Sequence, residues 1–361
     1  MTRFDNFLKV VKSFSAKSLK ACNVRPEISV YCIELIKMYR LYLLILLFAL
    51  CSFPCMAQKV IVGNISFKNA SIEPDPAPYG DFKTLVVPIK RAGNLIVIEA
   101  KVDSVEGNFI LDTGAPYLVL NETYFRDSPK NDEDQATGIT GASTGSFTTT
   151  VHNFTILDLQ YSRLTAQVTD LSFIENGRNI KILGLLGTRL FSKFAITVDL
   201  FRNVLYIQKL DKNGNIPETE IIYRDRFMVS PFHYLNDMIL LKGTVNNNEL
   251  WFIFDTAAET NLLDYNRSKK LMETMQVTGR SKLSGVGGSN VDVVFATFDQ
   301  LIVGDRMYMK NKVLLTNLDK MAETYGHPID GILGYDFFVR GIFSINFVKK
   351  EFEMYIYKTG N

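Results

Sequence analysis

Short hydrophobic runs separated by polar turns dominate most of the chain. Runs rich in Val, Ile, Phe and Thr are bounded by Gly, Asn and Asp, which is typical of short β-strands joined by tight turns. Clear predicted strands cover Leu85–Pro88, Leu95–Val102 and Phe147–Val151. Helices are expected only around Tyr265–Met275 and as one short turn after each of two Gly-x-x-Gly blocks. The pattern therefore predicts an all-β fold.

The same hydrophobic pattern occurs twice along the chain. Three blocks recur in the same order, at offsets of 143, 144 and 147 residues. The paired blocks are Asn108–Leu120 with Leu250–Leu262, Gly138–Gly145 with Lys282–Ser289, and Gly184–Phe191 with Gly331–Phe338. Because three blocks keep their register, the repeat predicts two similar lobes. The polar segment Lys209–Glu220 contains Asn-Gly and Pro, as expected of a connection between lobes, so we divide the chain into lobes at 58–214 and 215–361.

Residues 1–57 form an N-terminal extension plus a predicted signal peptide, whose core is residues 38–57. A basic flank precedes an apolar run from Leu41 to Leu50, and small residues follow, so we expect cleavage after Ala57 and Met38 as the true start. This predicts an exported protein, located in the periplasm, at the cell surface or secreted. The alternative is a protein anchored in the membrane through residues 39–53. Contact with a membrane is expected only if this segment is not cleaved.

Composition and charge narrow the possible partners of the protein. The chain is 47% hydrophobic and 22% charged, an ordinary globular composition. Residues 58–361 carry 32 Lys and Arg against 35 Asp and Glu, which gives no reason to expect a nucleic-acid partner. All four cysteines lie within residues 1–57, so the exported domain is expected to fold without a disulfide. We expect a monomer.

Each first block is an apolar strand that ends at an Asp-Thr pair, followed by small residues. If a two-fold axis relates the lobes, Asp112 and Asp255 meet at that axis, and two adjacent carboxylates then share one proton. The ionised member can activate water while the protonated member polarises a peptide carbonyl. The hydroxyl groups of Thr113 and Thr256 are expected to hydrogen-bond across to the opposing copy. The duplicated context outweighs the alternative that Asp and Gly merely form a turn at a strand end.

The second blocks are candidate flaps over a substrate. Their exposed backbone groups could add strand-like hydrogen bonds to an extended peptide, although a plain hairpin tip is the alternative. The candidate residues are Gly141, Ala142, Gly285 and Val286.

The third blocks are expected to pack behind each carboxylate. No Lys-Ser/Thr follows them, which argues against phosphate loops. The histidines, His152, His233 and His327, are isolated, so we expect no metal site, and we place Trp251 in a lobe core.

Together these motifs resemble the aspartic protease superfamily of pepsins and retropepsins, in which a hydrophobic-hydrophobic-Asp-Thr/Ser-Gly motif and a later hydrophobic-hydrophobic-Gly block recur in each lobe. The resemblance extends from about Leu85 to Tyr357, and Phe109–Leu118 matches the active-site pattern throughout. The sequence resembles the two-lobed bacterial retropepsin-like members more than it resembles pepsin itself. The resemblance implies two β-barrel lobes related by a pseudo-two-fold axis with an active-site cleft between them, hydrolysis of an extended polypeptide, and no cofactor.

One position departs from the family pattern. Gly114 follows the first Asp-Thr pair, but Ala257 follows the second. We expect its methyl group to displace the second lobe slightly, since the backbone turns there beneath the two carboxylates. The leading hypothesis is an aspartic endopeptidase with Asp112 and Asp255 as its dyad. The alternatives are a catalytically weak or inactive peptide-binding module with the same fold, and a structural envelope protein.

Overall fold

The computed structural model describes residues 77–357, apart from residues 132–135, 139–140, 144–145, 177, 236, 267–268, 285–289, 320 and 323–328. The signal segment lies outside the described residues, so export, cleavage after Ala57 and the alternative membrane anchor stay predictions. No helix in the described part of the chain combines the length and the hydropathy needed to span a bilayer.

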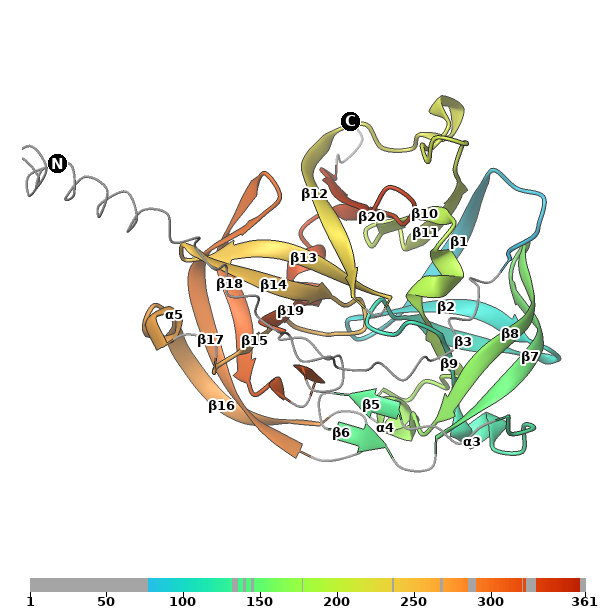
Figure 1. Ribbon diagram of the computed structural model, residues 1–361, viewed down its shortest axis with the longest axis horizontal. Coiled ribbons are helices and arrows are strands. Elements are labelled where there is room, and N and C mark those ends of the chain that lie inside the picture. Colours follow the sequence, from blue (N-terminus) through green and yellow to red (C-terminus); the bar gives the residue numbers. More distant parts are fainter. Residues whose placement is uncertain are drawn as a thin grey trace, which may run out of the picture. The chain divides into compact units, whose positions relative to one another are not determined.

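Six strands close the first barrel, drawn in cyan to green in Figure 1. The hydrogen-bonded order is β2–β3–β9–β4–β8–β7, and β7 pairs again with β2. The strands are β2 (Leu95–Val102), β3 (Val105–Leu111), β4 (Leu118–Asn121), β7 (Phe147–Ile156), β8 (Leu159–Thr169) and β9 (Gly184–Leu186). The helices α3 (Glu122–Phe125) and α4 (Ser172–Asn176) and the hairpin β5 (Ala136–Gly138) and β6 (Gly141–Ser143) lie between them in sequence.

The second barrel, in yellow to red in Figure 1, repeats this order as β13–β14–β19–β15–β18–β17, and β17 pairs again with β13. Its strands are β13 (Met238–Val245), β14 (Asn248–Phe254), β15 (Leu262–Asp264), β17 (Asn290–Val303), β18 (Arg306–Thr316) and β19 (Gly331–Leu333). The remaining elements are α5 (Lys269–Glu273) and β16 (Gln276–Ser284). The repeat extends to register, because Phe109 lies opposite Gly184 in the first barrel and Phe252 opposite Gly331 in the second.

A six-stranded sheet joins the two lobes. Its hydrogen-bonded order is β1–β11–β10–β20–β21–β12, so that three strands come from each half of the chain. The strands are β1 (Thr84–Ala92), β10 (Phe194–Asp199), β11 (Val204–Lys209), β12 (Arg226–Leu235), β20 (Ile342–Asn346) and β21 (Glu351–Tyr355). The short helices are η1 (Thr188–Phe191), η2 (Glu218–Glu220) and α7 (Tyr335–Phe338).

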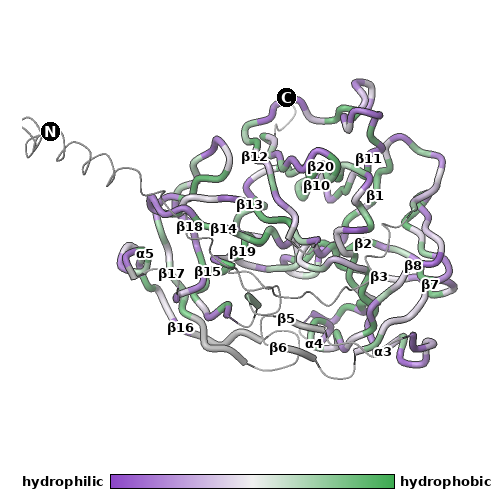
Figure 2. The backbone as a smooth tube through the Cα atoms, viewed as in Figure 1, coloured by the Kyte–Doolittle hydropathy of each residue, from purple (hydrophilic) through white to green (hydrophobic). Residues whose placement is uncertain are grey.

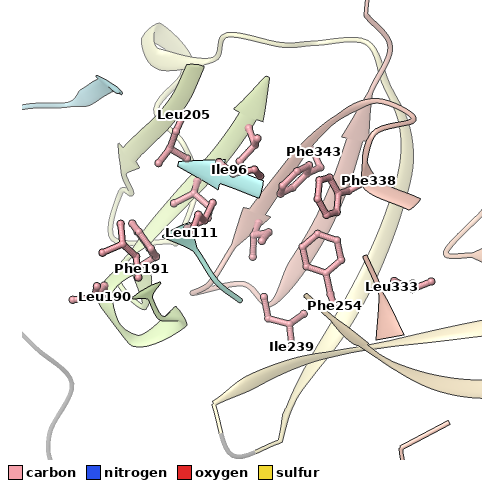
Figure 3. Close-up of a cluster of buried hydrophobic side chains, with 14 of the residues drawn as sticks. Ile96, Leu111, Leu190, Phe191, Leu205, Ile239, Phe254, Leu333, Phe338 and Phe343 are labelled. Atoms are coloured by element: carbon pink, nitrogen blue, oxygen red, sulfur yellow. The ribbon is translucent and has the colours of Figure 1, made fainter. Parts of the chain in front are cut away.

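One large apolar cluster runs through both barrels and the joining sheet. Leu111 and Phe254, which immediately precede the two candidate aspartates, are both fully buried in it (Figure 3). Figure 2 shows hydrophobic stretches on the central strands and hydrophilic residues at many of the outer turns. Because each strand is fixed by burial up to its last residue, the position of the aspartate that follows is also fixed.

The predicted all-β, two-lobed fold is confirmed, and the three predicted strands and the short helical turns after the Gly-x-x-Gly blocks are present. The helix expected over Tyr265–Met275 was too long, since α5 covers only Lys269–Glu273. Trp251 was wrongly placed in the core. It is 37% exposed, because it points outward between the buried Leu250 and Phe252 on an alternating strand. The lobe boundary near residue 215 falls between β11 and β12 and stays a prediction.

Candidate active site

Each candidate aspartate directly follows a buried strand and is held from behind by the third block. The backbone N–H of Asp112 donates to the carbonyl of Leu186 at 3.0 Å, and that of Asp255 donates to Leu333 at the same distance. These acceptors end β9 and β19. A Cβ atom at Gly184 would lie 2.1 Å from the carbonyl oxygen of Val119, so only glycine permits this close packing.

Two buried threonines join the aspartate loops reciprocally. The Thr113 hydroxyl donates to the carbonyl of Phe254 at 2.8 Å, and the Thr256 hydroxyl donates to the carbonyl of Leu111 at 2.7 Å. Each hydroxyl also accepts the other threonine's backbone N–H, at 3.0 and 3.1 Å. The predicted contact between the copies is therefore present, with four hydrogen bonds crossing the pseudo-two-fold axis.

The carboxyl groups of Asp112 and Asp255 are hydrogen-bonded to each other. Asp112 Oδ1 accepts the backbone N–H of Gly114 at 2.8 Å, and Asp255 Oδ1 accepts that of Ala257 at 2.8 Å. Asp255 Oδ1 also accepts the N–H of Ala258 at 3.2 Å. The structure thus brings together all six residues predicted for the dyad and its support.

The two carboxyl groups differ in their electrostatics. Burial raises the pKa of Asp112 well above its usual value, and the neighbouring charge of Asp255 raises that pKa further. Burial also raises the pKa of Asp255, but the N–H groups of Ala257 and Ala258 and the hydrogen bond from Asp112 oppose that rise. A pair that binds one proton therefore titrates as a unit, and the two N–H groups bonded to Asp255 Oδ1 favour the charged form of that member.

Gly114 and Ala257 occupy equivalent places in the two loops but have different surroundings. A Cβ atom at Gly114 would lie 2.7 Å from the Cγ atom of Asp255. Ala257 instead packs its side chain against a first-lobe apolar cluster. The displacement expected from its methyl group is not seen in the turn, because the N–H to Oδ1 distance is 2.8 Å in both loops.

Only part of the predicted flaps is described. In the first lobe β5 and β6 form a hairpin, in which Gly138 lies opposite Gly141 and Thr137 opposite Ala142. In the second lobe the pairing of β16 with β17 is described as far as Ser284 and Asn290. Gly285 and Val286 lie outside the described residues. Contact of any of these residues with substrate stays a prediction.

Sequence patterns missed a second set of contacts that join the lobes beside the dyad. Glu259 of the second lobe forms an ion pair with Arg178 of the first, and its carboxylate accepts the backbone N–H of Asn94 at 3.3 Å. On the other flank, the Thr188 hydroxyl donates to the carbonyl of Asp237 at 2.6 Å. Asn94 and Asp237 are 143 residues apart, the offset of the two aspartates, so equivalent hairpin turns reach across in both directions. Both contacts use a backbone group, the N–H of Asn94 and the carbonyl of Asp237, and backbone groups leave no motif in the sequence.

Among the residues that the structure describes, no group of three or more His, Cys, Asp or Glu side chains is arranged to hold a metal ion. His152 is exposed, and His233 packs against Trp251 with a ring distance of 5.3 Å. His327 lies outside the described residues.

The match to a protein-family model agrees with this geometry. A family model described as "Aspartyl protease" matches residues 98–190 and 241–337, one stretch in each barrel and together more than half of the chain. The chain belongs to the aspartyl protease family. A solved structure, the crystal structure of aspartic proteinase from Irpex lacteus, is similar at 12% identity and a TM-score of 0.46, covering 76% of this chain and 97% of that chain. No curated protein matches the sequence.

The threonine bonds of this aspartyl protease are expected to contribute strongly to its stability. Thr113→Val keeps the shape of a side chain that is 1% exposed but leaves the Phe254 carbonyl and the Thr256 N–H without partners. Each such buried group costs about 1–3 kcal/mol. Urea unfolding should therefore show a loss of at least about 1 kcal/mol. The exposed Thr123→Val serves as the matched control, and equal unfolding free energies for the two variants would contradict the role of this bond network.

Proposed function

We propose that this aspartyl protease is an endopeptidase that hydrolyses extended polypeptides with Asp112 and Asp255 as its general acid and base. The observation that carries the proposal is the pair of hydrogen-bonded carboxyl groups, fixed by reciprocal threonine bonds at the junction of the lobes. Family membership supports a peptide hydrolase in general.

The unequal surroundings of the two carboxyl groups suggest their roles. Asp255, stabilised as the anion by the N–H groups of Ala257 and Ala258, takes a proton from a water molecule as its oxygen attacks the peptide carbonyl carbon. Asp112 donates its proton to the carbonyl oxygen, which gives a neutral tetrahedral diol. The proton on Asp255 then passes to the amide nitrogen, the C–N bond breaks, and a diol hydroxyl returns a proton to Asp112.

The reciprocal bonds between Thr113 and Thr256 support this assignment because they limit relative motion of the two aspartate loops. Both carboxyl groups exchange a proton with the reacting groups, so the two loops must hold them in position within a fraction of an ångström. The equal hydrogen-bond lengths at Gly114 and Ala257 favour this active form over an inactive peptide-binding module.

The rate of hydrolysis is expected to depend on pH as a bell-shaped curve. Activity requires a singly protonated pair, so the rate rises as the pair loses its first proton and falls as it loses the second. Since burial and mutual repulsion raise the pKa of Asp112, the falling limb should lie above 3.8, the usual value of an aspartate side chain. Initial rates of cleavage of an unfolded protein substrate, measured from acid to neutral pH, test this expectation.

A statine-type transition-state mimic is the control for this measurement. It should abolish the cleavage, because an assembled dyad binds the tetrahedral geometry far more tightly than it binds substrate. Cleavage that persists at saturating mimic, or a rate without a falling limb, would remove the dyad from the mechanism.

A further inference from the structure

A cavity of about 380 Å³ lies between the joining sheet and the connection between β11 and β12. Its volume falls within the range of roughly 300–1,000 Å³ that is typical of small-molecule pockets. Thr197, Gln208 and Ser344 line it from the sheet, and Ile216, Ile221 and Ile222 line it from the connection. Neither Asp112 nor Asp255 belongs to its lining, so the cavity is separate from the dyad.

The connection is fastened to the sheet along its length, which keeps the cavity open beneath it. The Asn346 side chain donates to the carbonyl of Gly214 at 2.9 Å, and the Gln208 side chain donates to the carbonyl of Glu220 at 2.6 Å. Further along, the Tyr223 hydroxyl donates to Asp199 at 2.6 Å. A segment that both links the lobes and roofs a cavity can respond to a ligand bound there.

The floor of the cavity is polar although it is buried. Thr197 and Ser344 lie opposite each other where β10 pairs with β20, and their hydroxyl groups are 3.0 Å apart. They are 147 residues apart, the offset of the third repeated block, so equivalent residues of the two halves of the chain pair with each other there. Gln208 adds a third polar side chain, only 2% exposed. Thr197 and Ser344 bond to each other and Gln208 bonds to Glu220, but the Ser344 hydroxyl can still donate its own proton and both hydroxyl oxygens can accept a further hydrogen bond from a polar ligand.

The charges around the cavity indicate the kind of ligand. Arg226 forms an ion pair with Glu353 at 2.6 Å, so these two lining charges compensate each other. Arg224 pairs outside the lining with Glu218 at 2.6 Å. Two opposite charges of the lining then remain. Lys349 donates to the neutral amide of Asn215 and interacts electrostatically with Asp211 outside the lining, and Glu351 interacts with Arg226, but in the described part of the chain neither forms an ion pair within 4.0 Å.

We infer that this cavity binds a small zwitterion, a free amino acid or a dipeptide. Its ammonium group pairs with Glu351, its carboxylate with Lys349, and the hydroxyl groups of Thr197 and Ser344 bind the polar backbone between them. The isoleucines of the connection cover its side chain. Binding fixes the connection between the lobes, so it stabilises the folded protein through a site that the dyad does not share.

Alanyl-alanine is the probe, titrated calorimetrically into the full-length protein and into Asp112→Asn. Equal affinity for the two proteins is expected, because the lining contains neither aspartate, and the result does not depend on whether the protein is a protease. The same dipeptide should raise the temperature of thermal unfolding. The dipeptide blocked at both ends, N-acetyl-alanyl-alanine amide, lacks both charges and should bind at least about tenfold more weakly.

Two variants locate the site. Glu351→Gln and Lys349→Met should each weaken binding of alanyl-alanine about tenfold or more. The exposed Lys212→Met on the same connection removes a charge outside the lining and should leave affinity unchanged. Glu351→Gln is nearly isosteric and keeps the fold, and its unfolding temperature without ligand checks this. The absence of binding heat and of a thermal shift, equal binding of the blocked dipeptide, or unchanged affinity in both cavity variants each overturns the inference.

Discussion

Asp112→Asn will reduce the rate of peptide hydrolysis by about 10²–10⁴-fold, because a general acid whose proton enters the transition state contributes that much to the rate. The amide is nearly isosteric with the carboxyl group, so it can still accept the N–H of Gly114 and contact Asp255. What it lacks is an acidic proton that can be given to the carbonyl oxygen and recovered. The measurement is the initial rate of cleavage of an unfolded protein substrate at the pH optimum of the wild type.

Asp255→Asn should reduce the rate of hydrolysis by a similar factor, because it removes the general base instead of the general acid. Asp127→Asn is the matched control, because Asp127 is exposed, and it should cleave at the wild-type rate. Circular dichroism and thermal unfolding of the three variants separate loss of chemistry from loss of fold. If Asp112→Asn cleaves as fast as Asp127→Asn, the dyad assignment is wrong.

Gly114→Ala should reduce hydrolysis by about 10²-fold, the effect of misplacing reacting groups by about an ångström. The new methyl group would lie 2.7 Å from Cγ and Oδ2 of Asp255, closer than real side-chain atoms approach. Either Asp255 or the turn that holds it must move. Since Asp255 Oδ1 accepts the backbone N–H groups of Ala257 and Ala258, a small shift also changes the pKa difference between the two carboxyl groups.

Ala257→Gly is the reciprocal change and should leave the rate within a few-fold of the wild type. Its methyl group packs against the first-lobe cluster, so its removal costs about 1 kcal/mol of stability rather than activity. The pair of variants also separates the two functional hypotheses. An inert wild type that gains hydrolysis only with Ala257→Gly would support the peptide-binding module and contradict the proposed endopeptidase.

The unequal effects expected at Gly114 and Ala257 reflect how a duplicated fold can diverge. The two loops keep the same backbone hydrogen bonds, at 2.8 Å in both, while their side-chain surroundings differ. The same holds for the interlobe contacts, where Asn94 contacts Glu259 and its repeat equivalent Asp237 contacts Thr188. Backbone geometry is shared between the lobes, whereas the charge distribution around the dyad is not.

Sequence patterns predicted the parts of the fold that depend on local periodicity. Short runs rich in Val, Ile, Phe and Thr, bounded by turn residues, located β1, β2 and β7, and the repeat of three blocks predicted two equivalent lobes. The same reasoning failed for Trp251, because an aromatic residue was assumed to be buried without regard to the side of the strand on which it lies. It also overextended α5, where few residues separate one strand from the next.

The sequence by itself determined the repeat, the strands that end at Asp112 and Asp255, and the threonines that can bond between copies. These follow from the order of apolar, polar and small residues, which is a property of the chain. Only the tertiary structure decided that the two carboxyl groups have unequal surroundings, that a methyl group fits at 257 but not at 114, and that a polar cavity lies beneath the connection. Those results depend on distances between groups more than a hundred residues apart, and such distances are set by packing of the two lobes rather than by any local pattern.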